Sequence, residues 1–199
     1  MSAVTLGLAR RLSSNDAMHR SLWIHPLSLP SPISRIRVDA VRGTDGRLSL
    51  VYIVNHVGAV VIPEQCPSRA ADDLWRHTCF EAFVRCGEGN GYVELNFSPS
   101  TEWAAYGFDG YRSGMRRLKI EAPTIEPMRV GDYFALRAEV DLGHLPELVP
   151  WETWEIGLSA VIEANDGSLS HWALVHPAGP PDFHHPDCFV ADLAPAASL

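Results

Sequence analysis

Apolar and polar residues alternate with a period of two along most of this chain, from about residue 35 to its end. Such alternation is typical of β-strands that bury one face, because successive side chains of an extended chain point to opposite sides. Glycine, proline, asparagine and aspartate interrupt the pattern at short intervals, as in the NDG stretch at 165–167, which indicates a hairpin turn. Helical periodicity is scarce, so the pattern predicts an almost entirely β chain.

The alternating segments predict about ten strands. They cover residues 35–42, 47–56, 58–62, 76–86, 91–98, 102–108, 117–121, 133–141, 153–164, 169–175 and 188–193. A short helix is expected within 66–74 or 143–149. Short turns and the absence of a repeat of fixed period favour one antiparallel β-sandwich of jelly-roll or immunoglobulin-like type. We expect a single domain over residues 33–199, preceded by a partly irregular N-terminal extension over 1–32.

Charge and hydropathy exclude several classes of partner. The formal net charge of -8 argues against nucleic-acid binding, because neutralising phosphates requires clustered lysine and arginine. Arg10 and Arg11 interrupt the N-terminal apolar residues, and no apolar run reaches transmembrane length, so we expect no membrane insertion and a cytoplasmic location. The four cysteines lack a CxxC pair and are expected to be free thiols. One basic cluster is interpreted as solvated surface: Arg112, Arg116, Arg117 and Lys119.

The stretch LWRHTCFEAF at 74–83 carries polar residues inside an apolar strand pattern. In an extended chain Phe80 and Ala82 enter a core, while His77, Cys79 and Glu81 line the opposite side. The next strand, which follows a GEGNG turn, repeats the alternation and places its own polar side chains on that same side. The shared polar face is either solvated, as is common for one side of an antiparallel sheet, or a binding site.

Aromatic residues beside these polar groups favour the binding site, because flat rings stack on ligands while polar groups fix the ligand's orientation. The alternative for each tryptophan is a place in the core, given the large area that it buries. The candidate ligand-binding residues are Trp75, Arg76, His77, Glu81, Glu94, Asn96, Trp103, Arg137 and Trp172.

A proline-rich segment near the end of the chain holds three further candidates, His176, His184 and His185, which are possible metal ligands. No HxH or HExxH pattern accompanies them, so a hydrogen-bonding or loop-tethering role is the alternative. Known catalytic motifs such as GxSxG are absent. Two catalytic roles for His77 are considered: a base that activates Cys79, and one member of an acid–base pair with Glu81. A buried thiol is the simpler interpretation of Cys79.

Four stretches resemble a known family: LWRHTCFEAFV, GYVELNFSPSTEWAAYGFDGYRSGM, GLSAVIE and HWALVHPAGPPDFHHPDCF. They are similar to the bacterial DOMON-like proteins of the MurB-associated group, which are relatives of DOMON domains and of family-9 carbohydrate-binding modules. The resemblance runs from about residue 35 to 193. It implies a β-sandwich that binds a small ligand, with sugars and haem as the two ligand classes met among relatives.

The resemblance also implies roles for particular residues. In the carbohydrate-binding modules a stacking tryptophan precedes a hydrogen-bonding glutamate by six residues, and Trp75 and Glu81 stand at that spacing. Trp172 is the candidate for a second, late stacking ring. Haem-binding DOMON domains use an axial methionine and histidine, and Met115 and Met128 are the methionines in loop-like segments here.

The leading hypothesis is therefore a domain that binds a saccharide or similar polar ligand and needs no cofactor. The alternatives are a haem or metal protein that uses the C-terminal histidines, and an enzyme with a His77–Glu81 acid–base pair. The sequence does not specify the oligomeric state.

Overall fold

The computed structural model describes residues 17–194, so residues 1–16 of the predicted N-terminal extension lie outside the described residues. The described chain contains three short 3-10 helices, η1 (Val57–Ala59), η2 (Leu74–Arg76) and η3 (Pro186–Cys188). Its strands are β1 (Met18–Ile24), β2 (Ile36–Arg42), β3 (Arg47–Asn55), β4 (Cys79–Cys86), β5 (Tyr92–Phe97), β6 (Trp103–Phe108), β7 (Arg116–Arg117), β8 (Thr124–Val130), β9 (Tyr133–Asp141), β10 (Trp154–Glu163), β11 (Leu169–Ala173) and β12 (Ala191–Leu193).

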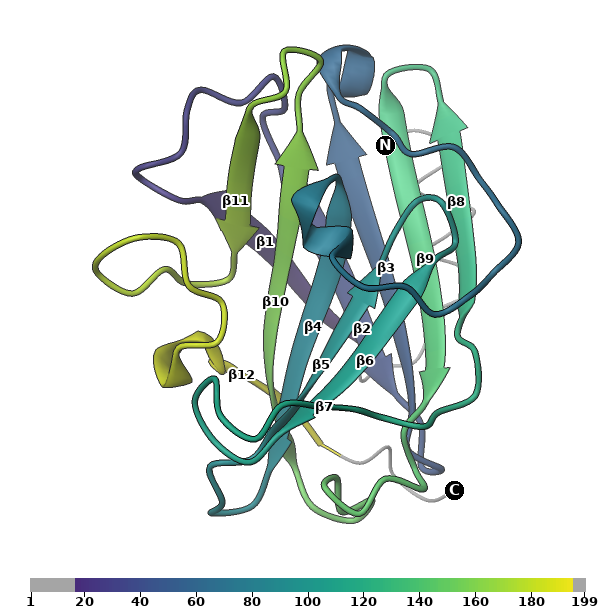
Figure 1. Cartoon of the computed structure of the whole chain (residues 1–199), viewed down its shortest axis with the longest axis vertical. Helices are drawn as coiled ribbons and strands as arrows, with labels where there is room; N and C mark the ends of the chain where they lie inside the picture. The colour runs from purple at the N-terminus through teal and green to yellow at the C-terminus, as the bar shows by residue number, and fades with distance from the viewer. Residues whose placement is uncertain (1–16, 195–199) are drawn as a thin grey trace.

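These strands form two facing layers (Figure 1). Sheet A has the order β1-β2-β3-β9-β8, and sheet B has the order β11-β10-β4-β5-β6-β7, with β12 beside the start of β10. Strand β1 joins the layers, because its residues 18–22 pair with β2 and its residues 23–24 pair with β11. All of these pairs are antiparallel, which confirms the predicted antiparallel β-sandwich.

The core lies between the two sheets, and the strand alternation decides which residues enter it. Phe80 and Ala82 of β4 face the core, as do Val93 and Leu95 of β5. The intervening residues point to the outer face of sheet B. That face carries its own smaller apolar cluster, made of Phe83, Tyr92, Ala104, Tyr106, Phe108 and Phe189, because loops cover part of it. The polar face predicted for β4 and β5 is therefore sheltered.

Two strands were not predicted from the sequence. Strand β1 lies inside the segment expected to be partly irregular, and β8 was expected to be a loop. Both show weak apolar alternation. In β8 the reason is that it is an edge strand, with mostly exposed side chains and with Pro127 in its middle.

The strand predicted at 58–62 is wrong. His56 has a left-handed backbone (φ 59), η1 follows it, and only Val60 bridges to Ala164. Of the two predicted helical segments, the first ends at the start of η2, and the second contains no helix among the described residues.

The turns bring the strands together largely as predicted. The NDG sequence joins β10 to β11, with Gly167 in a left-handed conformation (φ 81) that a side chain would strain. The four cysteines are free thiols. Across residues 17–194, no helix combines the length and the apolar character that crossing a bilayer requires.

Candidate functional site

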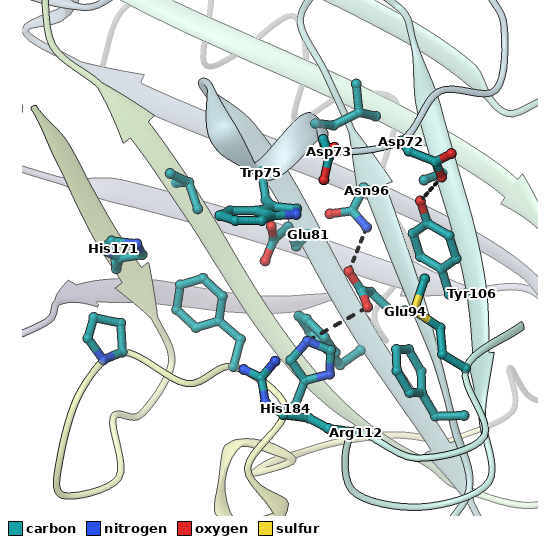
Figure 2. Close-up of a pocket in the computed structure, with 18 residues that line it drawn as sticks. Asp72, Asp73, Trp75, Glu81, Glu94, Asn96, Tyr106, Arg112, His171 and His184 are labelled. Carbon is teal, nitrogen blue, oxygen red and sulfur yellow. Dashed lines mark hydrogen bonds and ion pairs between the residues drawn. The ribbon is translucent and has the colours of Figure 1, made fainter. Parts of the chain in front are cut away.

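A cavity of about 500 Å³ opens on the outer face of sheet B. Figure 2 shows the side chains that converge on it from the sheet and from the segments around it. Strands β4, β5, β6 and β10 form its floor. Three segments far apart in the sequence form its walls, namely 72–75, 112–115 and 181–184.

The walls are tied together by polar contacts. Asp182 accepts hydrogen bonds from the Arg112 guanidinium (2.7 Å) and the Tyr111 hydroxyl (2.6 Å), which links the two loops. The Nδ1 atom of His184 lies 2.8 Å from the Tyr92 hydroxyl, so this loop is also held against β5. The segment before η2 is fixed to β6 by a bridge between Ala70 and Trp103. These ties hold the cavity open in one geometry.

The floor is built from two carboxyl groups and one amide. Glu81 of β4 is paired with Asn96 of β5, and Glu94 lies two residues from Asn96 on the same face. The two glutamates are thus diagonal neighbours, whose Cβ atoms lie about 7 Å apart in such sheets. The Asn96 amide donates to Glu94 Oε1 (2.8 Å), and the Ser159 hydroxyl of β10 donates to Glu81 Oε2 (3.1 Å).

Burial changes the protonation of these groups. Desolvation, and secondarily the charge of Glu94, raise the pKa of Glu81 to about 8. Desolvation also raises the pKa of Glu94, although the hydrogen bond from Asn96 opposes it. Desolvation lowers the pKa of His184 to about 4, so this imidazole is neutral at neutral pH. At neutral pH the floor therefore holds a protonated carboxyl beside an unprotonated imidazole.

The rim carries aromatic surfaces. Trp75 is held on η2 and is about half exposed, so its indole is open to a ligand. Tyr106 of β6 lines the cavity, and its hydroxyl donates a hydrogen bond to Asp72. This bond is the main cause of the lowered pKa of Asp72. A ligand entering here meets an indole at the rim and carboxyl groups below it.

The structure brings four of the predicted binding residues into the cavity: Trp75, Glu81, Glu94 and Asn96. Arg76 and His77 lie next to Trp75 in the chain but do not line the cavity. The Arg76 guanidinium lies 5.3 Å from the Trp75 ring centroid. The His77 ring contacts Glu163 (Nδ1 to Oε2, 2.8 Å) at the surface.

Three predicted residues lie elsewhere, two because their side chains face the core and one because it belongs to the other sheet. Trp103 and Trp172 point into the core between the sheets. The residues adjacent to them, Ala104 and His171, face the cavity instead. Arg137 belongs to β9 of sheet A, where its guanidinium contacts Glu139 and Glu126, so it is remote from sheet B.

Several lining residues were not predicted as ligand-binding residues. Tyr106 follows from the alternation of β6 once its register is known, because Tyr106 faces the same side as Ala104. Loop residues have no strand alternation from which their place in the cavity could be predicted. Tertiary contacts alone bring in Asp72, Arg112, Met115, Phe183 and His184.

The catalytic hypotheses do not fit this geometry. Cys79 is fully buried, and desolvation raises its pKa well above the ordinary value, the opposite of an activated thiol. His77 is bound to Glu163 and does not reach the cavity in which Glu81 lies. Neither pair with His77 is an acid–base unit in this structure.

The histidines proposed as metal ligands lie apart from one another. Among the described residues, no three His, Cys, Asp or Glu side chains form a group that can hold a metal ion. His176 contacts the Trp23 carbonyl (2.7 Å), and His185 packs against Tyr111, so the three candidate histidines do not converge.

Met115 and His184 line the same cavity, and methionine and histidine are the two residue types that the family resemblance links to haem. The Nδ1 atom of His184 is bonded to Tyr92, whereas its Nε2 atom lies 3.8 Å from Glu94, beyond hydrogen-bond distance. An axial ligand needs one free ring nitrogen directed at the metal. The Nε2 atom is such a nitrogen, but among the described residues four carboxyl groups line the cavity against a single guanidinium, and they oppose the two anionic propionate groups of haem.

No family model and no curated protein matches this chain. Among solved structures it is similar to a provisionally assigned carbohydrate-binding protein from Bacteroides uniformis, with 13% identity, a TM-score of 0.63, and 92% of this chain and 88% of that chain covered. A family-9 carbohydrate-binding module from Caldicellulosiruptor kristjanssonii, solved with cellotriose, matches with 8% identity, a TM-score of 0.52, and coverage of 83% and 76%. At such identities the likeness establishes the fold, a β-sandwich of the family-9 module type, and not the ligand.

Proposed function

We propose that this protein binds a saccharide in the cavity on the outer face of sheet B. One observation carries the proposal: an accessible indole, Trp75, stands over a cavity whose floor presents the buried polar groups of Glu81, Glu94 and Asn96. Apolar ring faces of a sugar stack on an indole, and its hydroxyls exchange hydrogen bonds with carboxyl and amide groups.

The shared fold supports this proposal, because two of the structures with this fold are described as carbohydrate-binding. The volume also supports it, because about 500 Å³ lies within the range of small-ligand pockets. The DOMON-like assignment and the cytoplasmic location stay predictions.

Replacing Trp75 with alanine is expected to weaken binding of the best sugar by about ten-fold or more, equivalent to about 1.4 kcal/mol. The reason is that the indole provides the exposed stacking surface at the rim. Isothermal titration calorimetry against a panel of mono- and oligosaccharides measures the effect.

Trp151→Ala is the matched control, because Trp151 is 79% exposed and does not line the cavity. It is expected to bind like the parent protein. Equal affinities for the parent and Trp75→Ala, or no sugar bound by the parent, would contradict the proposal.

Protein purified from cells supplied with haem is expected to show no Soret band, because the four carboxyl groups that line the cavity, against one guanidinium, oppose the propionate groups of haem. An absorption spectrum checks this directly. A stoichiometric Soret band that disappears in Met115→Leu would instead make the cavity a haem site.

A further inference from the structure

Carboxyl groups outnumber basic groups in the cavity. Four carboxyl groups line the cavity, those of Asp72, Asp73, Glu81 and Glu94. One guanidinium, that of Arg112, lines it as well. The charge of Arg112 is already matched, because its Nη2 atom donates to Asp182 at 2.7 Å.

The four carboxyl groups differ in their partners. Asp72 and Asp73 at the rim contact Arg117 and Arg76, respectively. The two glutamates on the floor are more than nine-tenths buried, at 3% exposure for Glu81 and 8% for Glu94. Within the described part of the chain, neither glutamate forms an ion pair with a lysine or arginine, although the more distant charge of Arg112 lowers the pKa of Glu94 and so partly opposes the effect of burial.

The acceptor oxygens on the floor are only partly used. Glu81 accepts from Ser159 through Oε2, and Glu94 accepts from Asn96 through Oε1. The nearest basic atom to Glu94 Oε2 is the His184 Nε2 atom at 3.8 Å, which is beyond hydrogen-bond distance. One oxygen of each buried carboxyl therefore remains for a ligand, and buried carboxylates are stable only when they are paired.

We infer that the cavity selects a ligand carrying a primary ammonium group, an amino sugar without an N-acyl substituent, whose ammonium sits between Glu81 and Glu94. This inference rests on the proposed function and narrows its ligand class. A sugar hydroxyl donates one hydrogen bond and brings no charge, so Glu81 stays protonated beside Glu94. An ammonium donates three and supplies the positive charge that the described floor residues lack.

Binding of the ammonium group is coupled to the release of a proton from Glu81. Glu81 holds its proton at neutral pH because ionisation beside Glu94 in a buried site is unfavourable. An ammonium removes that obstacle, so Glu81 ionises as the amine enters and releases up to about one proton. A neutral sugar leaves the proton in place.

Calorimetry with matched sugars tests the inference. The probes are three β-1,4-linked trimers that differ at carbon 2 alone, namely the glucosamine trimer, cellotriose and the N-acetylglucosamine trimer, together with galactosamine and galactose. Each titration is run near neutral pH in two buffers of different ionisation enthalpy. We expect the amine to bind about ten-fold or more tightly than its neutral counterpart, with proton release.

Variants connect the preference to the two carboxyl groups. Glu94→Gln and Glu81→Gln are expected to reduce the ratio of amine to neutral affinity by about five-fold or more, since each removes one charge that faces the ammonium. Glu88→Gln is the matched control, because Glu88 lies exposed in the β4–β5 turn outside the cavity, and it is expected to leave the ratio unchanged.

The outcomes separate the inference from the proposed function. Equal or tighter binding of cellotriose or galactose, or amine binding without proton release, overturns the ammonium inference and leaves saccharide binding in place. Absence of binding by every sugar in the panel overturns both.

Discussion

Replacing Arg42 with methionine is expected to lower the free energy of unfolding by about 3 kcal/mol or more. Arg42 ends β2, yet its side chain is only 3% exposed. Its guanidinium donates to four backbone carbonyl groups, of Val149, Pro150, Glu152 and Leu193. It also stacks on the fully buried ring of Trp154, with 3.6 Å between Cζ and the ring centroid.

The size of the effect follows from what these contacts join. The four carbonyl groups belong to β12 and to the segment before β10, so one side chain from sheet A anchors the far end of sheet B. Methionine fills part of the space but removes the guanidinium donor from all four carbonyl groups, of which, among the described residues, only that of Val149 keeps another side-chain donor, the Trp154 indole N–H at 3.1 Å. Unsatisfied buried acceptors are costly.

Urea unfolding at equilibrium measures the effect, with an unchanged dependence on urea concentration showing that the native state is preserved. Arg35→Met is the control, because the Arg35 side chain is exposed and, among residues 17–194, donates one hydrogen bond, to Ser21. A change within about 0.5 kcal/mol is expected there. If Arg42→Met were as stable as this control, the contacts of the Arg42 guanidinium would contribute nothing to the free energy of unfolding.

Glu81→Gln is expected to stabilise the protein at about pH 8 and to have little effect at about pH 5. The pKa of Glu81 is raised from 4.5 to about 8 in the folded state. Between pH 4.5 and about 8, Glu81 therefore keeps its proton in the folded state and has lost it in the unfolded state. Stability from this group is fully present below pH 4.5 and is lost as the pH rises through about 8.

Each pKa unit corresponds to about 1.4 kcal/mol, so the expected difference across this range is a few kcal/mol. Glutamine keeps the size and the polar contact with Ser159 but cannot ionise. It also removes the repulsion that acts on Glu94, whose raised pKa adds to the same dependence.

The quantity to measure is the difference in unfolding free energy between Glu81→Gln and the parent at each pH. The difference is needed because His184, with its pKa lowered to about 4, gives the parent an opposite dependence at acidic pH. Glu88→Gln should show no such pH-dependent difference. A constant difference for Glu81→Gln between about pH 5 and pH 8 would mean that Glu81 is ionised throughout.

The sequence predicted the fold because the strand alternation is a local property. Phe80 and Ala82 face the core, and Glu81 faces away from it, wherever β4 lies in the sheet. The same reasoning misassigned Trp103 and Trp172, because an aromatic side chain was given more weight than the phase of the strand. Counting along β6 and β11 from a known core residue gives Tyr106 and His171 as the outward residues.

By itself the sequence determined which side chains of β4 and β5 share a face, since a period of two leaves them no other arrangement. Tertiary structure alone decided that this face is covered rather than solvated. The decision depends on contacts over long sequence separations, such as that between Arg112 and Asp182. The same covering removed Glu81 and Glu94 from water and made their ionisation costly, because desolvation acts on a site only after distant segments have enclosed it.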